Sequence, residues 1–122
     1  LFVSGFCWGG TRVWDFAVSH ADLSGAFVFY GTATDDALAK ADKIPCGVYG
    51  FFGGNDARVN ATLEKTSAAL KAAGKIFEPV IYDGAGHAFM RLGEEGTPTP
   101  ANKAGMEKAW ERWLALLGEA GR

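Results

Sequence analysis

The sequence predicts an α/β fold in which a parallel sheet is flanked by helices on both faces. Strand-like and helix-like segments alternate along the 122 residues, which is the order expected of a parallel sheet. Ala26–Tyr30 is a continuous apolar run, the pattern of a strand that is buried on both faces. Ligands of such sheets bind at the carboxyl ends of the strands. Functional side chains are therefore expected in the loops that follow strands.

The first half of the chain is expected to fold as strand, helix, strand and short helix. In order, these elements should occupy residues 1–3, 10–20, 26–30 and 35–41. Val13, Phe16 and Ala17 recur at the spacing that turns one face of the first helix toward a core. The opening residues read as the tail of an apolar strand, so we expect the chain to be part of a longer domain.

The second half is expected to continue this alternation. Its strands and helices should occupy residues 46–52, 60–74, 76–82 and 103–117. Asn60 can cap the helix that it begins, and Gly74 can end it. Pro79 cannot donate a hydrogen bond to a neighbouring strand, so we expect its strand at an edge of the sheet. The last helix should bury one face, formed by Met106, Trp110, Trp113, Leu114 and Leu117.

Cys7 stands in a sequence that predicts a nucleophile on a strained turn between a strand and a helix. Residues 5–10 read Gly-Phe-Cys-Trp-Gly-Gly, so that glycines bracket the cysteine. Gly5 and Gly9 should be required because the strand and helix backbones pass close to each other. The positive end of the helix should favour the reactive thiolate, and the Trp8 N–H is placed to donate to an oxyanion. The alternative is that Cys7 is a small buried apolar residue.

Two further polar residues follow predicted strands and could act together with Cys7. Asp56 comes after the strand at 46–52, and His87 comes after the strand at 76–82. The chain order of nucleophile, acid and histidine is that of α/β-hydrolases. An acid in this position can hold a histidine in the correct tautomer. Taken singly, Asp56 also fits an ordinary turn, and His87 fits a surface loop.

Composition and motif spacing argue against several other function classes. The net charge of −2 gives no basic footprint for nucleic acid, and no apolar run is long enough to span a membrane. Two cysteines are too few for a disulfide scaffold, and no metal-ligand spacing occurs. Residues 5–10 lack the Lys-Ser/Thr of a phosphate loop. We interpret the acidic pairs 35–36 and 94–95 as solvated surface, and Cys46 as a core residue.

The chain resembles the dienelactone hydrolase family of α/β-hydrolases over nearly its whole length. The matching stretches are Gly-Phe-Cys-Trp-Gly-Gly at 5–10, Phe-Val-Phe-Tyr-Gly at 27–31, Gly-Gly-Asn-Asp-Ala-Arg-Val at 53–59, Val-Ile-Tyr-Asp-Gly-Ala-Gly-His-Ala-Phe at 80–89 and Ala-Trp-Glu-Arg-Trp-Leu at 109–114. The resemblance implies that residues 1–122 are the C-terminal portion of a single α/β-hydrolase domain. The earlier strands of that domain would be missing from this sequence.

The resemblance also implies roles for individual residues. Cys7, Asp56 and His87 would form the catalytic triad. Arg91 stands where family members hold an arginine that binds the substrate carboxylate, and Tyr30 matches a family tyrosine near the pocket. Arg91 could equally be a surface arginine, and Tyr30 could equally be a core residue at the end of a buried strand.

The activity that the resemblance implies is hydrolysis of a lactone or ester of the dienelactone (carboxymethylenebutenolide) type, through a thioester on the cysteine. It implies no cofactor, a small-molecule substrate that could carry a carboxylate, no nucleic-acid or membrane partner, and a monomer at full length. The alternatives are a broader carboxylesterase and a truncated fragment with little or no activity. Because family members supply a second oxyanion donor from before the cysteine, we expect this chain alone to be weakly active. We also expect it to be poorly stable, because what should be a central strand of the sheet would be left as an unpaired apolar edge. A cytoplasmic location is favoured over a secreted or periplasmic one.

Overall fold

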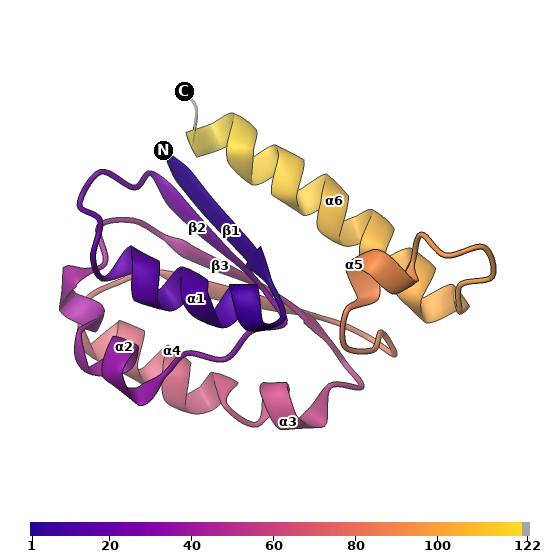
Figure 1. Ribbon diagram of the computed structural model, residues 1–122, viewed down its shortest axis with the longest axis horizontal. Coiled ribbons are helices and arrows are strands. Elements are labelled where there is room, and N and C mark those ends of the chain that lie inside the picture. The colour runs from indigo at the N-terminus through magenta and orange to yellow at the C-terminus, as the bar shows by residue number, and fades with distance from the viewer. Residues whose placement is uncertain (121–122) are drawn as a thin grey trace.

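The structure, a computed structural model that describes residues 1–120, contains a four-stranded sheet (Figure 1). Its strands are β1 (Phe2–Phe6), β2 (Gly25–Phe29), β3 (Val48–Gly53) and β4 (Phe77–Tyr82), and they lie side by side in that order. Each neighbouring pair is parallel. The predicted parallel sheet is therefore confirmed, and the carboxyl ends of its strands meet at one edge.

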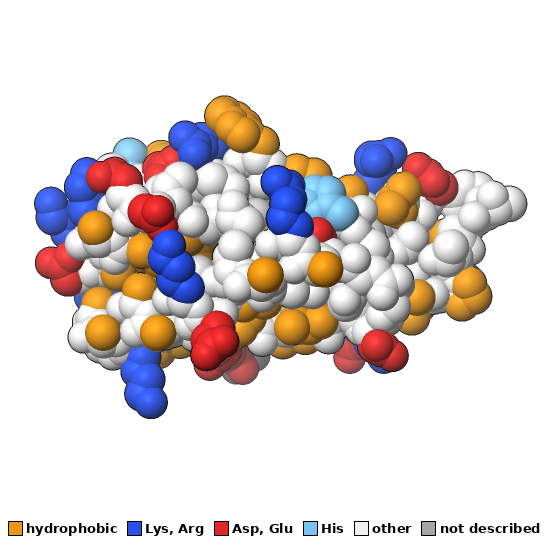
Figure 2. All heavy atoms as spheres, turned by 90° about the horizontal axis from the view of Figure 1, so that it is seen from below, with side chains coloured by type: hydrophobic (Ala, Val, Ile, Leu, Met, Phe, Trp, Pro, Cys, Tyr) orange, Lys and Arg blue, Asp and Glu red, His pale blue; other side chains and the backbone are white. Residues whose placement is uncertain are grey.

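Helices cover both faces of the sheet (Figure 1). The helical elements are α1 (Trp8–Ala17), α2 (Asp35–Ala39), the short turn η1 (Ala41–Lys43), α3 (Ala57–Asn60), α4 (Leu63–Ala72), α5 (Phe89–Leu92) and α6 (Pro100–Ala120). The helices α1, α2 and α4 lie on one face, and α6 crosses the opposite face. Among the residues that the structure describes, no helix is both long enough and apolar enough to cross a membrane. Charged side chains of both signs are scattered over the face seen in Figure 2 and gather into no single basic patch there.

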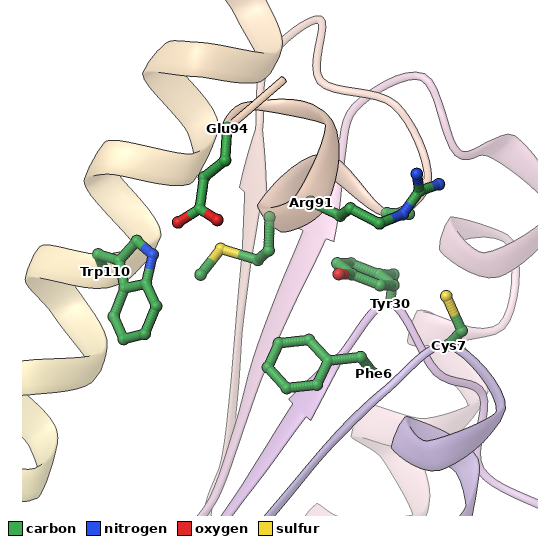
Figure 3. A pocket seen from close by; sticks show the side chains of 8 residues that line it. Phe6, Cys7, Tyr30, Arg91, Glu94 and Trp110 are labelled. Carbon is green, nitrogen blue, oxygen red and sulfur yellow. The ribbon is translucent and has the colours of Figure 1, made fainter. Parts of the chain in front are cut away.

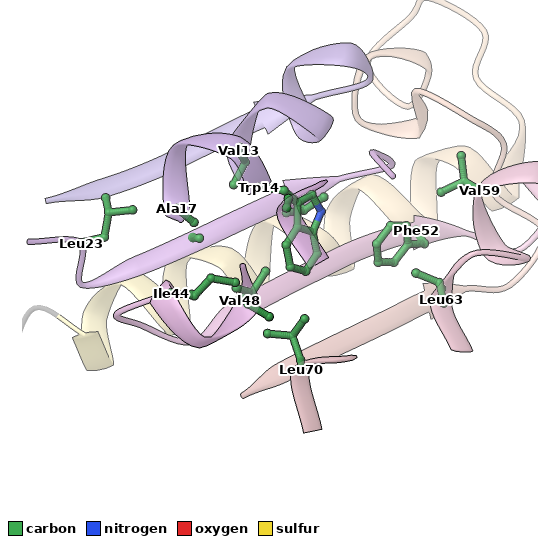
Figure 4. Close-up of a cluster of buried hydrophobic side chains, with 14 residues drawn as sticks. Val13, Trp14, Ala17, Leu23, Ile44, Val48, Phe52, Val59, Leu63 and Leu70 are labelled. Atoms are coloured by element: carbon green, nitrogen blue, oxygen red, sulfur yellow. The ribbon is translucent and has the colours of Figure 1, made fainter. Parts of the chain in front are cut away.

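The sheet separates two hydrophobic clusters, and the side-chain alternation along β2 explains its continuous apolar run. Ala26 and Val28 belong to the cluster on the α1 side, whereas Phe27 and Phe29 belong to the cluster beneath α6. Successive side chains of a strand point to opposite faces, so a strand that is covered on both sides needs apolar residues at every position. Figure 4 shows the first cluster, in which Trp14 of α1 lies among aliphatic side chains.

The edge position that Pro79 predicts for its strand is confirmed, because β4 ends the strand order. The Val48 N–H donates to the carbonyl of Ile76 at 3.0 Å, and the Gly54 N–H donates to the carbonyl of Tyr82 at 2.8 Å. Hydrogen bonding alternates along a parallel ladder, so the odd-numbered N–H groups of β4 point away from β3. A proline at position 79 therefore removes no hydrogen bond from the sheet.

Several expected helix boundaries are wrong. The first helix begins earlier than expected, at Trp8, and ends at Ala17. Asn60 does not cap the helix that follows it: it is the last residue of α3, and its side-chain amide donates to the carbonyl of Gly53 at 2.8 Å. The next helix, α4, begins at Leu63. The Asn60 amide is thus used to hold the end of β3 against α3.

The expectation that Trp110 and Leu114 are buried is also wrong. Trp110 is 39% exposed and Leu114 is 62% exposed. Trp113 takes the position against the sheet, where its ring centroid lies 4.8 Å from that of Phe29. Trp110 stacks on Trp113 with a centroid distance of 5.1 Å. The apolar stripe of α6 is therefore wider than the surface of the sheet that covers it.

Candidate active site

Cys7 connects β1 to α1 in a backbone conformation that L-amino acids rarely adopt. Its φ is 56° and its ψ is −121°, and its N–H donates to the carbonyl of Phe29 at 3.1 Å. Trp8 begins α1, so its N–H is one of the groups that a helix leaves without an internal partner. The turn therefore has the strained geometry that the glycine-bracketed pattern predicts.

Glycine contacts fix how closely β1, α1 and the end of β2 approach one another. A Cβ atom on Gly5 would lie 2.2 Å from the carbonyl oxygen of Gly9, and a Cβ atom on Gly31 would lie 2.4 Å from the carbonyl carbon of Gly10. Both positions therefore require glycine. A Cβ atom on Gly9 would meet nothing within 4 Å, so the expectation that Gly9 is sterically required is wrong. The parts of α1 that lie closest to Gly5 and Gly31 are the backbone atoms of Gly9 and Gly10.

Asp56 and His87 lie together at the carboxyl edge of the sheet. The Nδ1 atom of His87 lies 2.5 Å from Oδ2 of Asp56. Because a carboxylate only accepts hydrogen bonds, the proton of this bond belongs to Nδ1, which leaves Nε2 free to take a proton. The side chain of Asp56 is 10% exposed, whereas that of His87 is 42% exposed. The structure thus brings together the acid and the histidine that the sequence singled out.

Hydrogen bonds join the loop after β3 to the loop after β4, and these loops carry the acid and the histidine. The N–H of Asn55 donates to the carbonyl of Ala85 at 2.9 Å, and its side-chain amide donates to the carbonyl of Gly84 at 3.1 Å. The N–H of Gly86 donates to Oδ1 of Asn102 on α6 at 2.9 Å. The two loops are therefore held to each other and to the last helix.

A cavity of about 370 Å³ opens beside Cys7 (Figure 3). Its walls are formed by Phe6, Cys7, Tyr30, Ala88, Met90, Arg91, Glu94 and Trp110. Its volume suits a small organic ligand, and most of its wall is apolar. His87 is not part of this wall, and it forms its hydrogen bond with Asp56 rather than with the sulfur. Its ring approaches that of Tyr30, with the centroids 5.1 Å apart.

Tyr30 is both a core residue and part of the cavity wall. It is 3% exposed, and its N–H donates to the carbonyl of Phe51 at 2.8 Å. Its φ of 43° turns the chain sharply at the end of β2. Burial raises the pKa of the Tyr30 hydroxyl, so this group remains a neutral hydrogen-bond donor at physiological pH. Tyr30 is therefore a core residue at the end of a buried strand and a residue of the pocket, so both interpretations of it hold.

The surroundings of Cys7 favour the neutral thiol. Burial raises the pKa of the Cys7 thiol, the guanidinium of Arg91 lowers it by less, and the carboxylate of Asp56 raises it. The net shift of the Cys7 pKa is therefore upward, and these surroundings do not supply the thiolate that the position before a helix predicts. Attack by this sulfur needs a base that removes its proton.

Arg91 and Trp8 occupy different places relative to the cavity. Arg91 lines it, and in Figure 3 the guanidinium extends past Tyr30 on the side of Cys7. Its Nη1 also donates to Oε1 of Glu95 at 3.2 Å in an exposed ion pair. The Trp8 side chain is 74% exposed and lies against the Arg12 guanidinium, 5.2 Å from the ring centroid. The Trp8 side chain is outside the cavity wall, so the contact with an oxyanion that is predicted for Trp8 involves only its backbone N–H.

Several cavity residues were missed in the sequence because their roles depend on tertiary contacts. They are Phe6, Met90, Glu94 and Trp110. From the sequence, Glu94 is expected on the solvated surface and Trp110 in a buried stripe of the last helix. No local signal marks Glu94, which follows the end of α5, or Trp110, which reaches the cavity from α6.

Comparison with known proteins shows similarity along the whole chain. The model of the dienelactone hydrolase family matches residues 1–121. A protein of Salmonella typhimurium named as a carboxymethylenebutenolidase is 32% identical over 127 residues, which cover 97% of this chain and 47% of that protein. One of Saccharolobus solfataricus with the same name is 35% identical over 113 residues, which cover 93% and 42%. The chain therefore spans about half the length of the curated relatives it matches.

Solved structures show the same similarity in three dimensions. A dienelactone hydrolase from Klebsiella pneumoniae is 29% identical and superposes with a TM-score of 0.80, covering 94% of this chain and 50% of that one. A dienelactone hydrolase-like promiscuous phosphotriesterase from metagenomic libraries superposes with a TM-score of 0.81 at 20% identity, covering 98% and 52%. The latter likeness concerns the fold alone. The parallel sheet and its helices thus have the α/β-hydrolase fold.

Proposed function

The chain belongs to the dienelactone hydrolase family, and we propose that it hydrolyses a lactone or ester through a Cys7–His87–Asp56 triad. The hydrogen bond of 2.5 Å between His87 and Asp56 is the observation that carries this proposal. It joins two residues from different loops at the sheet edge where Cys7 occupies a strained turn. An acid that orients a histidine for proton transfer with a nucleophile is the arrangement that acyl transfer requires.

The thiol of Cys7 is neutral in these surroundings, so the proposed reaction begins with proton transfer. Nε2 of His87 takes the thiol proton, and the sulfur then forms a bond to the substrate carbonyl carbon. The oxyanion is stabilised by the N–H of Trp8. Collapse of this intermediate breaks the carbon–oxygen bond to the leaving group, which receives the proton from His87. A water molecule, deprotonated by His87, then hydrolyses the thioester and restores the thiol.

Replacing the proposed nucleophile tests this function. We expect Cys7→Ala to abolish hydrolysis of nitrophenyl acetate, measured as the initial rate of nitrophenolate release. Cys46→Ala is the matched control, since Cys46 lies away from the cavity and should leave the rate unchanged. An equal loss in the two variants, or full activity in Cys7→Ala, would contradict the proposal.

A carboxylate on the substrate is the finer part of the proposal, and Arg91 supports it. The guanidinium lines the cavity with Cys7 and is exposed enough to exchange its Glu95 partner for a ligand. If a substrate carboxylate binds there, Arg91→Ala should raise the KM of anionic esters and leave that of neutral esters unchanged. Equal effects on both would favour the second candidate, a broader carboxylesterase.

The rate of the chain by itself is a separate expectation. Family members form the oxyanion hole with a second donor, and removing one such donor lowers kcat by about 10²–10³-fold. We therefore expect slow turnover, which the Cys7→Ala comparison can still resolve from background hydrolysis. Fast turnover would contradict the expected weakness without contradicting the triad.

A further inference from the structure

The cavity beside Cys7 has charged groups of opposite sign in its wall. The Arg91 guanidinium extends on the Cys7 side, whereas the Glu94 carboxylate is directed toward Trp110 (Figure 3). Phe6 and other apolar side chains lie between these ends. A ligand that fills the cavity therefore meets a positive group near the reacting sulfur and a negative group at the far end.

Glu94 and Trp110 are held in place by the packing of α5 against α6. Gly93 precedes Glu94, and a Cβ atom added there would lie 2.5 Å from Cβ of Met106 on α6. Trp110 lies one helical turn beyond Met106 and is stacked on Trp113, with ring centroids 5.1 Å apart. Trp110 is therefore presented by a helix, and Glu94 lies in the turn that directly follows α5, where Gly93 is packed against α6.

The Glu94 carboxylate is available to a ligand. Within residues 1–120 it forms no salt bridge, whereas its neighbour Glu95 pairs with Arg91 at 3.2 Å. Trp110 keeps 39% of its surface exposed, which leaves part of the indole open to the cavity. A carboxylate beside an aromatic face attracts a cation by charge and through the ring quadrupole.

We infer that the Glu94–Trp110 end of the cavity is a subsite for a cationic group, such as an ammonium, on the substrate. This inference rests on the proposed hydrolase function and names a substrate class for it: esters whose acyl chain carries a positive group away from the reacting carbonyl. The carbonyl would lie at Cys7 while the apolar spacer crosses the cavity past Phe6. The cavity volume of about 370 Å³ is within the range that binds such small molecules.

The test compares nitrophenyl esters whose acyl chains have the same spacer and end in trimethylammonium, tert-butyl or carboxylate. The trimethylammonium and tert-butyl groups have the same shape, so their kcat/KM ratio isolates the charge. We expect the cationic ester to be preferred roughly three- to ten-fold, which is the size of an exposed ion pair plus a cation–π contact. Glu94→Gln should reduce this ratio to about one, and Trp110→Leu should reduce it in part.

Glu111→Gln is the matched control, because it removes the same charge beside Trp110 from a residue outside the cavity wall. It should retain the preference for the cationic ester. Equal rates for the cationic and tert-butyl esters in the unmodified chain would overturn the inference. So would an equal loss of preference in Glu94→Gln and Glu111→Gln, because that result would indicate only the general field of the protein.

Binding of phenyltrimethylammonium separates failure of the subsite from failure of the proposed function. We expect it to change the tryptophan fluorescence of the unmodified chain and of Cys7→Ala, with weaker binding to Glu94→Gln. Binding of this kind without any ester hydrolysis would support the subsite and contradict the hydrolase. Ester hydrolysis with no preference for the cationic ester and no binding of phenyltrimethylammonium would support the hydrolase and contradict the subsite.

Discussion

Gly5 determines how the chain passes from β1 into the turn at Cys7. A Cβ atom at this position would lie 2.2 Å from the carbonyl oxygen of Gly9, which is far inside van der Waals contact. The start of α1 would have to move to make room, and the strained backbone of Cys7 would move with it. The position of the proposed nucleophile therefore depends on a residue that has no side chain.

Replacing Gly5 by alanine is expected to destabilise the chain by about 1–3 kcal/mol, the usual cost of overpacking. Gly9→Ala is the control within the same motif, because a Cβ atom there meets nothing within 4 Å. It should be neutral or stabilising by up to about 1 kcal/mol, since alanine is the better helix former. Urea unfolding followed by circular dichroism measures both free energies. Similar losses in the two variants would contradict the steric explanation.

The last helix, α6, is attached to the sheet through Arg112. Its Nη1 donates to the carbonyl of Gly50 on β3 at 2.6 Å, and its Nη2 donates to the carbonyl of Glu78 on β4 at 2.7 Å. The guanidinium also lies over the Phe51 ring, 4.4 Å from its centroid. Because α6 carries Trp110, this attachment helps to set the far wall of the cavity.

Arg112→Met should keep the apolar stem of this side chain and remove both hydrogen bonds. We expect a loss of roughly 1.5–3 kcal/mol in the free energy of unfolding, the range for hydrogen bonds that involve a charged group. Lys103→Met, an exposed position on the same helix, should change stability by no more than about 0.5 kcal/mol. Chemical denaturation of the two variants provides the comparison, and an unchanged midpoint in Arg112→Met would show that these hydrogen bonds do not anchor the helix.

The sequence predicts elements better than it predicts the contacts between them. The apolar run at Ala26–Tyr30 and the proline at position 79 identify a central strand and an edge strand, because both follow from local backbone chemistry. Asn60 looked like a helix cap, but its amide is used in a tertiary contact with Gly53. The role of Trp110 depends on Trp113 occupying the place against the sheet. Contacts of this kind join segments that are distant in the sequence, so no local sequence pattern predicts them.

For the proposed site, the sequence indicates which residues lie at the same edge of the sheet, but it does not give their pKa values. Asp56 and His87 follow strands and were therefore expected at one edge of the sheet, where they form a hydrogen bond. The pKa of Cys7 could not be inferred from its position before a helix, because burial outweighs the other effects. Burial is a property of the folded molecule, so motif spacing alone does not give it.

For the whole molecule, large apolar side chains remain exposed along β1 and on α6. They include Leu1 at 63%, Phe2 at 37%, Phe6 at 42% and Leu114 at 62% exposure. In the described chain, β1 also ends the strand order, and an edge strand with apolar side chains favours association. The expectation that the chain alone is poorly stable therefore stays a prediction with a structural reason. A cooperative thermal unfolding transition at high temperature would contradict it.

Alkaline pH should destabilise the whole chain. Burial raises the pKa of several acidic groups in the folded state, namely Cys7, Tyr30, Cys46, Tyr49 and Tyr82. As pH rises past their ordinary values, the unfolded chain loses these protons first, so unfolding becomes more favourable. The stabilisation is present below those values and is lost as pH approaches and passes the raised ones.

Urea midpoints measured from neutral pH to above about pH 10 should therefore fall, with the tyrosines contributing at the upper end. Tyr30→Phe keeps the buried ring and removes one of the titrating groups, so its midpoint should fall less steeply. A pH profile that is flat in the unmodified chain, or identical in slope for Tyr30→Phe, would contradict the linkage.

The proposed mechanism requires a covalent acyl intermediate on Cys7, which can be trapped during turnover. The chain would be mixed with nitrophenyl acetate, quenched in acid during turnover, digested and analysed by peptide mass spectrometry. We expect an acetyl group on the peptide that contains Cys7, and none on the peptide that contains Cys46. Turnover with the acetyl group on Cys46 or Tyr30, or undiminished hydrolysis in Cys7→Ala, would contradict it.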